Sequence, residues 1–360
     1  MNLPPLQIGE TTVPIPIIQG GMGVGVSRSG LASAVAREGG IGIISGVHIG
    51  FMESDFEVNT KEANIRAIKK EIIRAKDLLV KESRGLIGVN FLVAMNHYDE
   101  LAASAVEAGA DLIISGAGLP ADLPGIVKGS KTKAVPIVSS AKAAAVITKL
   151  WDRKFNYVPE MIIVEGPEAG GHLGFSTDEL SDEKKRDVKD IVKEVITILS
   201  PYEQKLKRKI SVIAAGGIFD GRDIAECLKI GAAGVQMATR FVATEECDAH
   251  INYKNAYINA KESDITIIKS PVGLPGRAIR NKFIRSLEEC NIAVKKCYNC
   301  LKTCDPAVTP YCISKALINA VKGDIEEGLI FAGSKAYKLK NIVSVKTLIG
   351  ELVAEVNACI

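Results

Sequence analysis

Eight short apolar runs recur over the first two thirds of the 360-residue chain, and they constrain its fold more than any other feature. Each run is continuous and rich in isoleucine and valine, which is typical of parallel strands covered on both faces. The runs occupy residues 15–18, 41–45, 86–90, 112–116, 136–140, 161–165, 211–215 and 234–238. Segments with helical periodicity separate them, at 29–38, 60–79, 98–108, 141–150, 182–199 and 222–230. This alternation predicts an α/β protein whose core is a closed (β/α)8 TIM barrel.

An open, doubly wound sheet would show the same alternation, so other features have to separate the two architectures. Glycine-rich motifs follow several of the predicted strands, whereas a dinucleotide-binding sheet carries its glycine fingerprint after the first. The run Gly21-Met-Gly23-Val-Gly25 also lacks the spacing GxGxxG. Together with the count of eight strands, these features favour the closed barrel.

The pattern changes after the eighth predicted strand. Residues 243–328 lose strand periodicity and contain most of the cysteines. We therefore predict a barrel over 1–242 that binds the cofactor, a smaller, mainly helical and cysteine-rich cap subdomain over 243–328, and a C-terminal part over 329–360. A helix predicted at 345–357 would return from the cap to pack on the barrel.

The charges are nearly balanced, with 45 basic and 42 acidic residues and a formal net charge of +3. This balance gives no electrostatic reason to expect nucleic acid or an anionic membrane as a partner. The apolar runs fall well short of the ~20 residues that span a bilayer, and residues 1–10 do not resemble a signal peptide. We expect a cytoplasmic protein with reduced cysteines and a small-molecule substrate, and leave open whether it forms a homodimer.

The loop after the sixth predicted strand reads Glu165-Gly-Pro-Glu-Ala-Gly-Gly-His172. Loops that follow the strands of such a barrel build its active site. Gly170 and Gly171 would let the backbone pass close to a flat ligand, and His172 would stand at the barrel mouth as a proton donor or electrostatic partner. The alternative is an ordinary glycine turn followed by a surface histidine, and position alone does not decide between them.

Two further motifs follow the seventh and eighth predicted strands, where this architecture commonly binds phosphate. Ala214-Ala-Gly-Gly217 ends one strand, and Gln236-Met-Ala-Thr239-Arg ends the next. Backbone N–H groups of these loops and the Thr239 hydroxyl could bind a phosphate, and Arg240 could add charge. A plain turn would also explain the glycines, but two such signals at consecutive strand ends favour the phosphate site.

Amide side chains follow two other predicted strands. Gln19-Gly-Gly-Met22 comes after the first strand, and Asn90 ends the third. The pyrimidine edge of a flavin needs both hydrogen-bond donors and acceptors, and amides supply both. Each residue could instead cap the end of its strand.

Taken together, the motifs resemble those of the nitronate monooxygenases, formerly called 2-nitropropane dioxygenases, and of their sister group, the FMN-dependent type II enoyl-ACP reductases. The resemblance covers nearly the whole chain and rests on Gln19-Gly-Gly-Met22, Glu168-Ala-Gly-Gly-His172, Ala215-Gly-Gly217 and Gln236-Met-Ala-Thr-Arg-Phe241. It implies non-covalently bound FMN, which performs the redox step while the protein positions the substrate. The implied flavin contacts are Gln19, Gly20, Gly21, Met22, Asn90, Glu165, Gly170 and Gly171, and the implied phosphate contacts are Gly217, Gln236, Met237, Ala238 and Thr239.

The two branches imply different reactions. The first, which is our leading expectation, oxidises alkyl nitronates such as propionate 3-nitronate with oxygen. Its bacterial members commonly carry a catalytic histidine at the position that Ala144 occupies here. The alternative is an enoyl-thioester reductase, which passes hydride from NAD(P)H through the flavin and relies on the histidine that His172 matches. His172 is therefore the predicted catalytic residue.

Four cysteines with the spacing C-x2-C-x3-C-x7-C stand apart from these motifs: Cys297, Cys300, Cys304 and Cys312. Thiolates at such short spacing could ligate an iron–sulfur cluster or a structural Zn²⁺. A cluster near FMN would make a third function possible, that of a flavin and iron–sulfur electron carrier. The alternative is four reduced thiols without metal in the cap.

Overall fold

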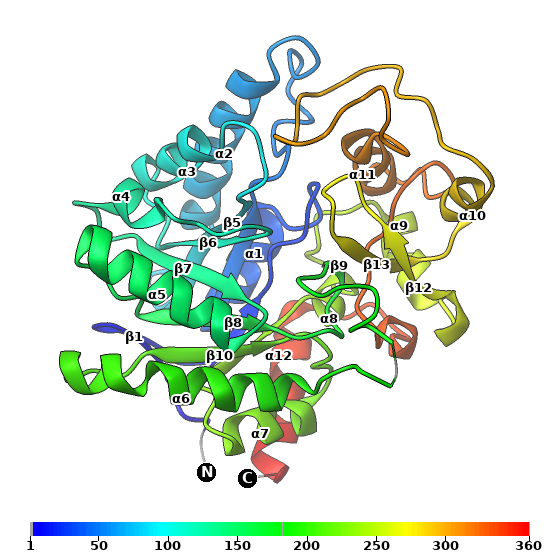
Figure 1. The fold of residues 1–360 in the computed structure, drawn as a ribbon. Coiled ribbons are helices and arrows are strands. Elements are labelled where there is room, and N and C mark those ends of the chain that lie inside the picture. The colour runs from blue at the N-terminus through cyan, green and yellow to red at the C-terminus, as the bar shows by residue number, and fades with distance from the viewer. Residues whose placement is uncertain (1–2, 182, 360) are drawn as a thin grey trace.

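The computed structural model describes residues 3–181 and 183–359. Its core is a closed, parallel, eight-stranded barrel with the strand order β10-β11-β3-β4-β5-β6-β7-β8, which confirms the predicted TIM-barrel fold (Figure 1). The strands are β3 (Ile17–Gln19), β4 (Ile41–Ser45), β5 (Leu86–Leu92), β6 (Leu112–Gly116), β7 (Lys133–Val138), β8 (Met161–Glu165), β10 (Ser211–Ala215) and β11 (Gly234–Met237). Nearly all of their residues are buried, as the continuous apolar runs indicated.

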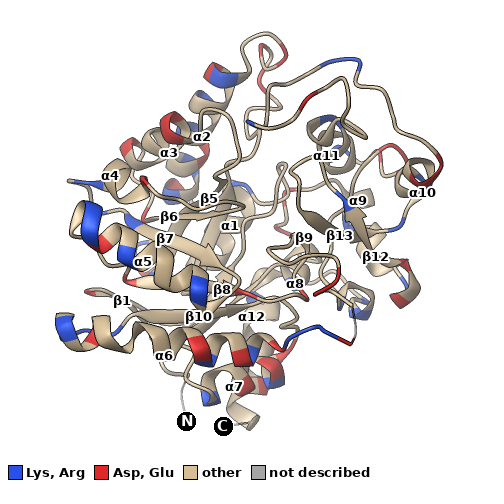
Figure 2. Ribbon diagram, in the orientation of Figure 1, with Lys and Arg blue, Asp and Glu red and all other residues tan. Residues whose placement is uncertain are grey.

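Helices cover the outside of the barrel: α1 (Ser29–Arg37), α2 (Thr60–Asp77), α3 (Tyr98–Glu107), α4 (Leu123–Val127), α5 (Ala141–Phe155), α6 (Val188–Leu206) and α7 (Gly221–Lys229). Charged residues lie on these helices, on the loops and on the cap, and few lie on the barrel strands (Figure 2). The helix predicted at 182–199 begins only at Val188, where the Asp187 carboxylate accepts the Lys189 N–H at 2.8 Å and caps it. The predicted first residue, Asp182, lies outside the described residues.

A hairpin of β1 (Leu6–Ile8) and β2 (Thr11–Val13), which the sequence pattern did not predict, closes the N-terminal end of the barrel. Leu6, Ile8 and Val13 are fully buried and belong to the same apolar cluster as the inward-facing strand residues, such as Ile43 and Ile163. The barrel interior is therefore a packed core rather than a pore. A ligand has to enter from the opposite end, at the carboxyl ends of the strands.

The segment that follows β11 begins with the short helix α8 (Thr239–Val242) and leads into the cap. The cap holds α9 (Ile251–Ile258), α10 (Lys282–Glu289) and α11 (Ile313–Val321), and it also holds β12 (Ile265–Lys269) and β13 (Pro275–Ile279). β13 pairs antiparallel with both β12 and the two-residue strand β9 (Gly171–His172), which lies in the loop after β8. The expectation that 243–328 lacks strands is therefore wrong for the β12–β13 hairpin, which joins the cap to the predicted site.

The last helix, α12 (Val345–Cys359), packs against α7 and α1. Its Glu355 carboxylate accepts the Gly221 N–H at 2.6 Å, at the first residue of α7. Both ends of the described chain consequently lie on the same side of the molecule, away from the cap (Figure 1). Within the described residues, none of the helices has the length and apolar character to cross a membrane.

The loop after β4 carries a buried histidine. His48 packs edge-on against the Phe56 ring, with ring centroids 5.4 Å apart, and also touches the Tyr298 ring of the cap. Neither of its ring nitrogens has a hydrogen-bond partner within the described protein. Burial lowers the pKa of His48 from 6.5 to about 4, because the charged imidazolium would lose its hydration.

This burial makes the protein sensitive to acid. Between pH 6.5 and pH 4 the unfolded imidazole binds a proton and the folded one does not, so stability falls as the pH falls through that window. At about 1.4 kcal/mol per pKa unit, the loss amounts to about 3 kcal/mol by pH 4. We expect His48→Phe to remove that much of the difference between unfolding free energies measured at pH 7 and pH 4. An unchanged difference would contradict this assignment.

Candidate active site

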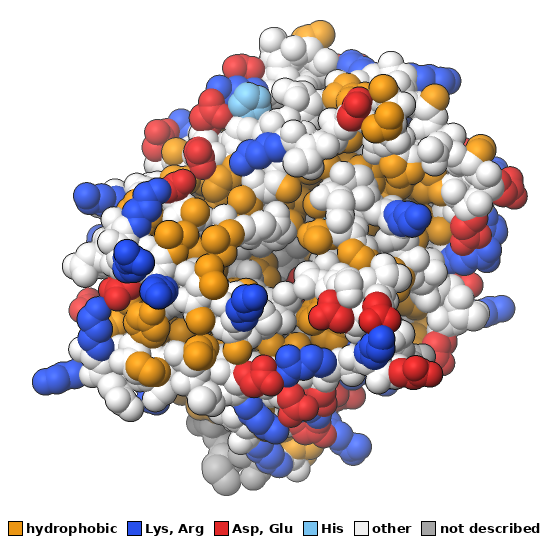
Figure 3. Space-filling model, viewed as in Figure 1, with side chains coloured by type: hydrophobic (Ala, Val, Ile, Leu, Met, Phe, Trp, Pro, Cys, Tyr) orange, Lys and Arg blue, Asp and Glu red, His pale blue; other side chains and the backbone are white. Residues whose placement is uncertain are grey.

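A cavity of about 490 Å³ opens between the carboxyl ends of the barrel strands and the cap. Its size lies within the range of small-molecule sites. Figure 3 views the hollowed face of the molecule, where hydrophobic side chains gather around the opening. Twelve of the predicted cofactor contacts and the predicted catalytic His172 line this cavity: Gly20, Gly21, Met22, Asn90, Glu165, Gly170, Gly171, Gly217, Gln236, Met237, Ala238 and Thr239. The loops of β3, β5, β8, β10 and β11 therefore converge as expected.

Gln19 is the exception among the predicted cofactor contacts. Its side chain is fully buried in the barrel wall, where Oε1 accepts the Ile43 N–H at 3.0 Å and Nε2 donates to the Ile43 carbonyl at 3.2 Å. The amide thus fastens β3 to β4 and does not line the cavity. The structure does not favour a flavin contact for the Gln19 side chain, because its hydrogen-bonding groups are already used within the sheet.

Two glycines of the cavity wall occupy positions that no other residue would fit. A Cβ atom on Gly170 would lie 2.6 Å from the Ala332 carbonyl carbon, so the chain of the loop after β8 touches the segment that follows the cap. Gly217, in the loop after β10, has a φ of +77° and would place a Cβ 2.3 Å from Glu168 Oε2. These close approaches leave backbone rather than side chains facing the cavity.

The loops after β10 and β11 form the end of the cavity where a phosphate is predicted. Gly217 and residues 236–239 lie side by side there, because β10 and β11 are neighbours in the barrel. The guanidinium of Arg240 turns away: it donates to the Phe219 carbonyl at 3.1 Å, lies 5.0 Å from the Phe219 ring centre and pairs with Glu351. Backbone N–H groups and the Thr239 hydroxyl therefore remain as the donors for a phosphate at this end.

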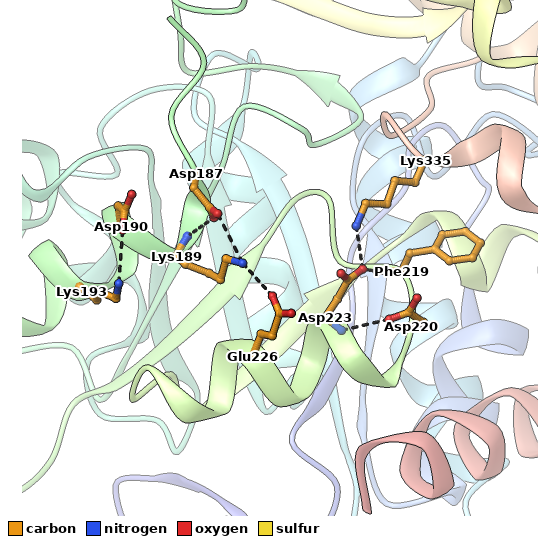
Figure 4. A network of polar contacts seen from close by, with 9 residues as sticks. All are labelled: Asp187, Lys189, Asp190, Lys193, Phe219, Asp220, Asp223, Glu226 and Lys335. Atoms are coloured by element: carbon orange, nitrogen blue, oxygen red, sulfur yellow. Dashed lines mark hydrogen bonds and ion pairs between the residues drawn. The ribbon is translucent and has the colours of Figure 1, made fainter. Parts of the chain in front are cut away.

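An ion-pair network braces these loops from outside the cavity (Figure 4). Asp223 accepts the Phe219 N–H at 2.8 Å and pairs with Lys335 at 2.8 Å, which ties the start of α7 to the segment after the cap. Lys189, at the start of α6, pairs with Glu226 of α7 at 2.7 Å. The network fixes the conformation of the turn between β10 and α7. A binding site built from backbone N–H groups needs such a fixed turn.

His172 lies in the two-residue strand β9 and is held by the cap. Its Nε2 lies 2.8 Å from Ser270 Oγ, and its ring packs edge-on against Phe331 with centroids 4.9 Å apart. Burial lowers the pKa of His172 to about 4, so the imidazole is neutral at pH 7. A neutral imidazole can donate one hydrogen bond into the cavity while its other nitrogen is engaged.

Glu165 is another titratable residue that lines the cavity. It ends β8, and burial raises the pKa of its carboxyl to about 7, because the carboxylate would lose its hydration there. Near neutral pH this side chain can hold or release a proton. Of the described residues that line the cavity, none is a lysine or arginine.

Comparisons with known proteins identify the family to which the chain belongs. The family model described as nitronate monooxygenase matches residues 5–355. The chain belongs to the nitronate monooxygenase family. A probable nitronate monooxygenase of Staphylococcus saprophyticus is 36% identical over 131 residues, which are 36% of this chain and 34% of the relative. A Rhodococcus jostii dehydrogenase of a hydroxy-methyl-oxo-octahydroindene carboxyl-CoA is 26% identical over 281 residues, covering 76% of this chain and 65% of that protein. The chain thus spans from about a third to just under two thirds of these relatives.

Solved structures agree with the family assignment. FabK from Thermotoga maritima superposes with a TM-score of 0.72 at 26% identity, covering 96% of this chain and 94% of that one. A nitroalkane oxidase from Streptomyces ansochromogenes superposes with a TM-score of 0.69 at 21% identity, covering 96% of each chain, and its likeness concerns the fold alone.

This member of the nitronate monooxygenase family lacks an imidazole on α5. Ala144, at the position where the resemblance implied a catalytic histidine, is fully buried and does not line the cavity, while its neighbour Ala143 does. Sequence reasoning missed the residues that the cap and the following segment contribute to the cavity: Tyr253, Tyr257, Leu274, Leu317, Phe331, Ala332 and Gly333. It also missed Ser270, which holds His172. No motif identifies them, because their place depends on how the cap folds over the barrel.

The structure gives no support to the predicted metal site at Cys297, Cys300, Cys304 and Cys312, which stays a prediction. All four thiols are free, and the described residues contain no group of three or more cysteine, histidine or carboxylate side chains placed to hold a metal ion. Cys297 is exposed, whereas Cys300 packs against the apolar core and burial raises its pKa to about 11.

Proposed function

We propose that the chain is an FMN-dependent oxidoreductase that oxidises alkyl nitronates, such as propionate 3-nitronate, with oxygen. The observation that carries this proposal is the cavity itself, which combines glycine-lined walls, amide groups and a cradle of backbone donors at the ends of neighbouring strands. Membership of the nitronate monooxygenase family supports the reaction.

The residues present fit FMN. The loop residues Gly217, Ala238 and Thr239 would hold its phosphate through backbone N–H groups and a hydroxyl, and the amide of Asn90 would meet its polar ring edge. When bound, the flavin supplies the redox chemistry. His172 would donate a hydrogen bond to the substrate, and the cap would exclude water from the cavity.

An anaerobic spectroscopic experiment tests the proposal. Purified protein loaded with FMN is mixed with propionate 3-nitronate, and separately with an alkyl nitronate that carries no carboxylate. We expect the visible bands of oxidised flavin to bleach and to return when oxygen is admitted. If the bands persist with every nitronate, the proposed reaction is wrong.

A second candidate is the reduction of an enoyl thioester by NAD(P)H. Two features favour an uncharged reacting group over an anionic nitronate: His172 is neutral at pH 7, and the described cavity wall holds no lysine or arginine. The likeness to FabK, an enoyl-ACP reductase, points the same way. A neutral imidazole can stabilise a developing enolate oxygen by hydrogen bonding.

Stopped-flow mixing without oxygen separates the two candidates. Rapid bleaching of the flavin by NADH or NADPH, followed by reoxidation with crotonyl thioester, would support the reductase. A flavin that neither nucleotide reduces, and that an alkyl nitronate does reduce, would exclude the reductase in favour of nitronate oxidation.

A further inference from the structure

Arg277 is a buried arginine of the cap that hydrogen-bonds to the loop between β8 and β9. It lies in β13, and only 7% of its surface is exposed. Its Nη1 donates to the Pro167 carbonyl at 2.7 Å and also to the Ala169 carbonyl. Burying a guanidinium is costly unless it is hydrogen-bonded, so these two bonds matter to the local structure.

The two carbonyls belong to the loop between β8 and β9, on either side of Glu168. Further along, the same loop presents Gly170, Gly171 and His172 to the cavity. The Glu168 carbonyl also accepts the Ser334 N–H at 3.1 Å, from the segment that follows the cap. The loop is therefore held from outside at successive residues, while its other side faces the cavity.

The backbone of Arg277 takes part in the same arrangement. In the β13–β9 register, Arg277 faces Gly171 and its neighbour Gly276 faces His172. The Arg277 carbonyl accepts the Ala332 N–H at 3.0 Å, and Ala332 is the residue that Gly170 touches. Through its side chain and its backbone, one cap residue thus fixes both ends of the run from Pro167 to Gly171.

Burial disfavours the charge of the guanidinium, and a nearby carboxylate offsets part of that cost. Burial lowers the pKa of Arg277 below the ordinary value for arginine, and the nearby Glu168 carboxylate opposes that shift. Arginine remains charged at every pH at which the protein is folded, so its donors are always available. Hydrogen bonds from a charged donor are about twice as strong as neutral ones.

We propose that Arg277 is a positioning residue, which holds the loop after β8 so that Gly170 and Gly171 form a wall for the cofactor and His172 faces the cavity. This inference rests on the proposed function only in that the cavity holds FMN. Arg277 does not itself line the cavity, so it acts through the loop.

The test compares Arg277→Met and Arg277→Lys with Arg280→Met as a matched control. Arg280 lies three residues further along, is exposed and pairs with Glu288 at 2.6 Å on the surface. Two quantities are measured: hydrogen–deuterium exchange of residues 165–172 in the apo-protein, and the Kd for FMN from quenching of its fluorescence. The melting temperature of each variant is recorded alongside.

For Arg277→Met we expect loop exchange to rise at least about tenfold and the Kd to rise about tenfold to a hundredfold, from the loss of two charge-assisted hydrogen bonds. Arg277→Lys should lie between it and the wild type, and Arg280→Met should match the wild type. A merely structural role would lower the melting temperature and leave the Kd of the folded protein unchanged.

Wild-type exchange and Kd in a folded Arg277→Met protein would overturn the inference. If that variant does not fold, Arg277→Lys decides, and unchanged values there overturn it equally. A wild-type protein that does not bind FMN would refute the proposed function, whereas loop exchange in the apo-protein would still decide the role of Arg277.

Discussion

Replacing His172 by alanine is expected to lower turnover by about 10²- to 10⁴-fold, the range typical of a positioned proton donor or acceptor. FMN affinity should change far less, because the proposed phosphate contacts belong to other loops, those after β10 and β11. His172 and Glu165 both line the cavity, and burial shifts the pKa of each toward its neutral form. Its hydrogen bond to Ser270 leaves the second ring nitrogen for the substrate.

Single-turnover reduction of the flavin by substrate, and steady-state turnover, measure this effect. His97→Asn provides the control, since that histidine is exposed at the start of α3 and pairs with Glu100. Turnover in His172→Ala within about threefold of wild type would remove His172 from the reaction and direct attention to Glu165.

Replacing Gly217 by valine is expected to abolish FMN binding. A branched residue at a φ of +77° is strained by about 1–2 kcal/mol. Its Cβ would also lie 2.3 Å from Glu168 Oε2, so the loop or Glu168 has to shift at the point where the phosphate is bound. The expected result is purified protein without flavin and an FMN Kd raised at least about a hundredfold.

Gly129→Val is the control that separates the effect of losing the phosphate site from the effect of backbone strain. Gly129 has a φ of +81° but no atom within 4 Å of its Cβ position, and it lies outside the cavity. That variant should lose stability of a similar size and keep its flavin. If Gly217→Val binds FMN as tightly as the Gly129→Val protein, the loop after β10 is not the phosphate site.

The barrel could be predicted from the sequence because its strands are buried on both faces, so that runs such as 41–45 and 161–165 carry no polar side chain before their last residue. The hairpins β1–β2 and β12–β13 were not predicted, because their strands are only partly buried and show no such continuous apolar run. The strands of the first are three residues long, too short for a pattern, and β13 contains Pro275, Gly276 and the buried Arg277, which do not read as a strand.

The residues of the candidate site also differed in how well the sequence predicted them. Residues at strand ends, such as Asn90 and Gly217, were predictable because every parallel strand delivers its carboxyl end to one rim. Gln19 is the exception, because it is still part of β3 and its side-chain amide hydrogen-bonds to Ile43 of the neighbouring strand β4. Ser270 and Phe331 meet His172 only through the packing of the cap, which no local pattern encodes.

Titrating the apo-protein with FMN and with riboflavin, which lacks the phosphate, tests the central claim most directly. A cavity with a phosphate cradle after β10 and β11 predicts one FMN bound per chain. It also predicts an affinity for riboflavin at least about a hundredfold weaker, because several hydrogen bonds to a charged group are lost. Equal affinities for the two compounds, or no binding of FMN, would contradict the account.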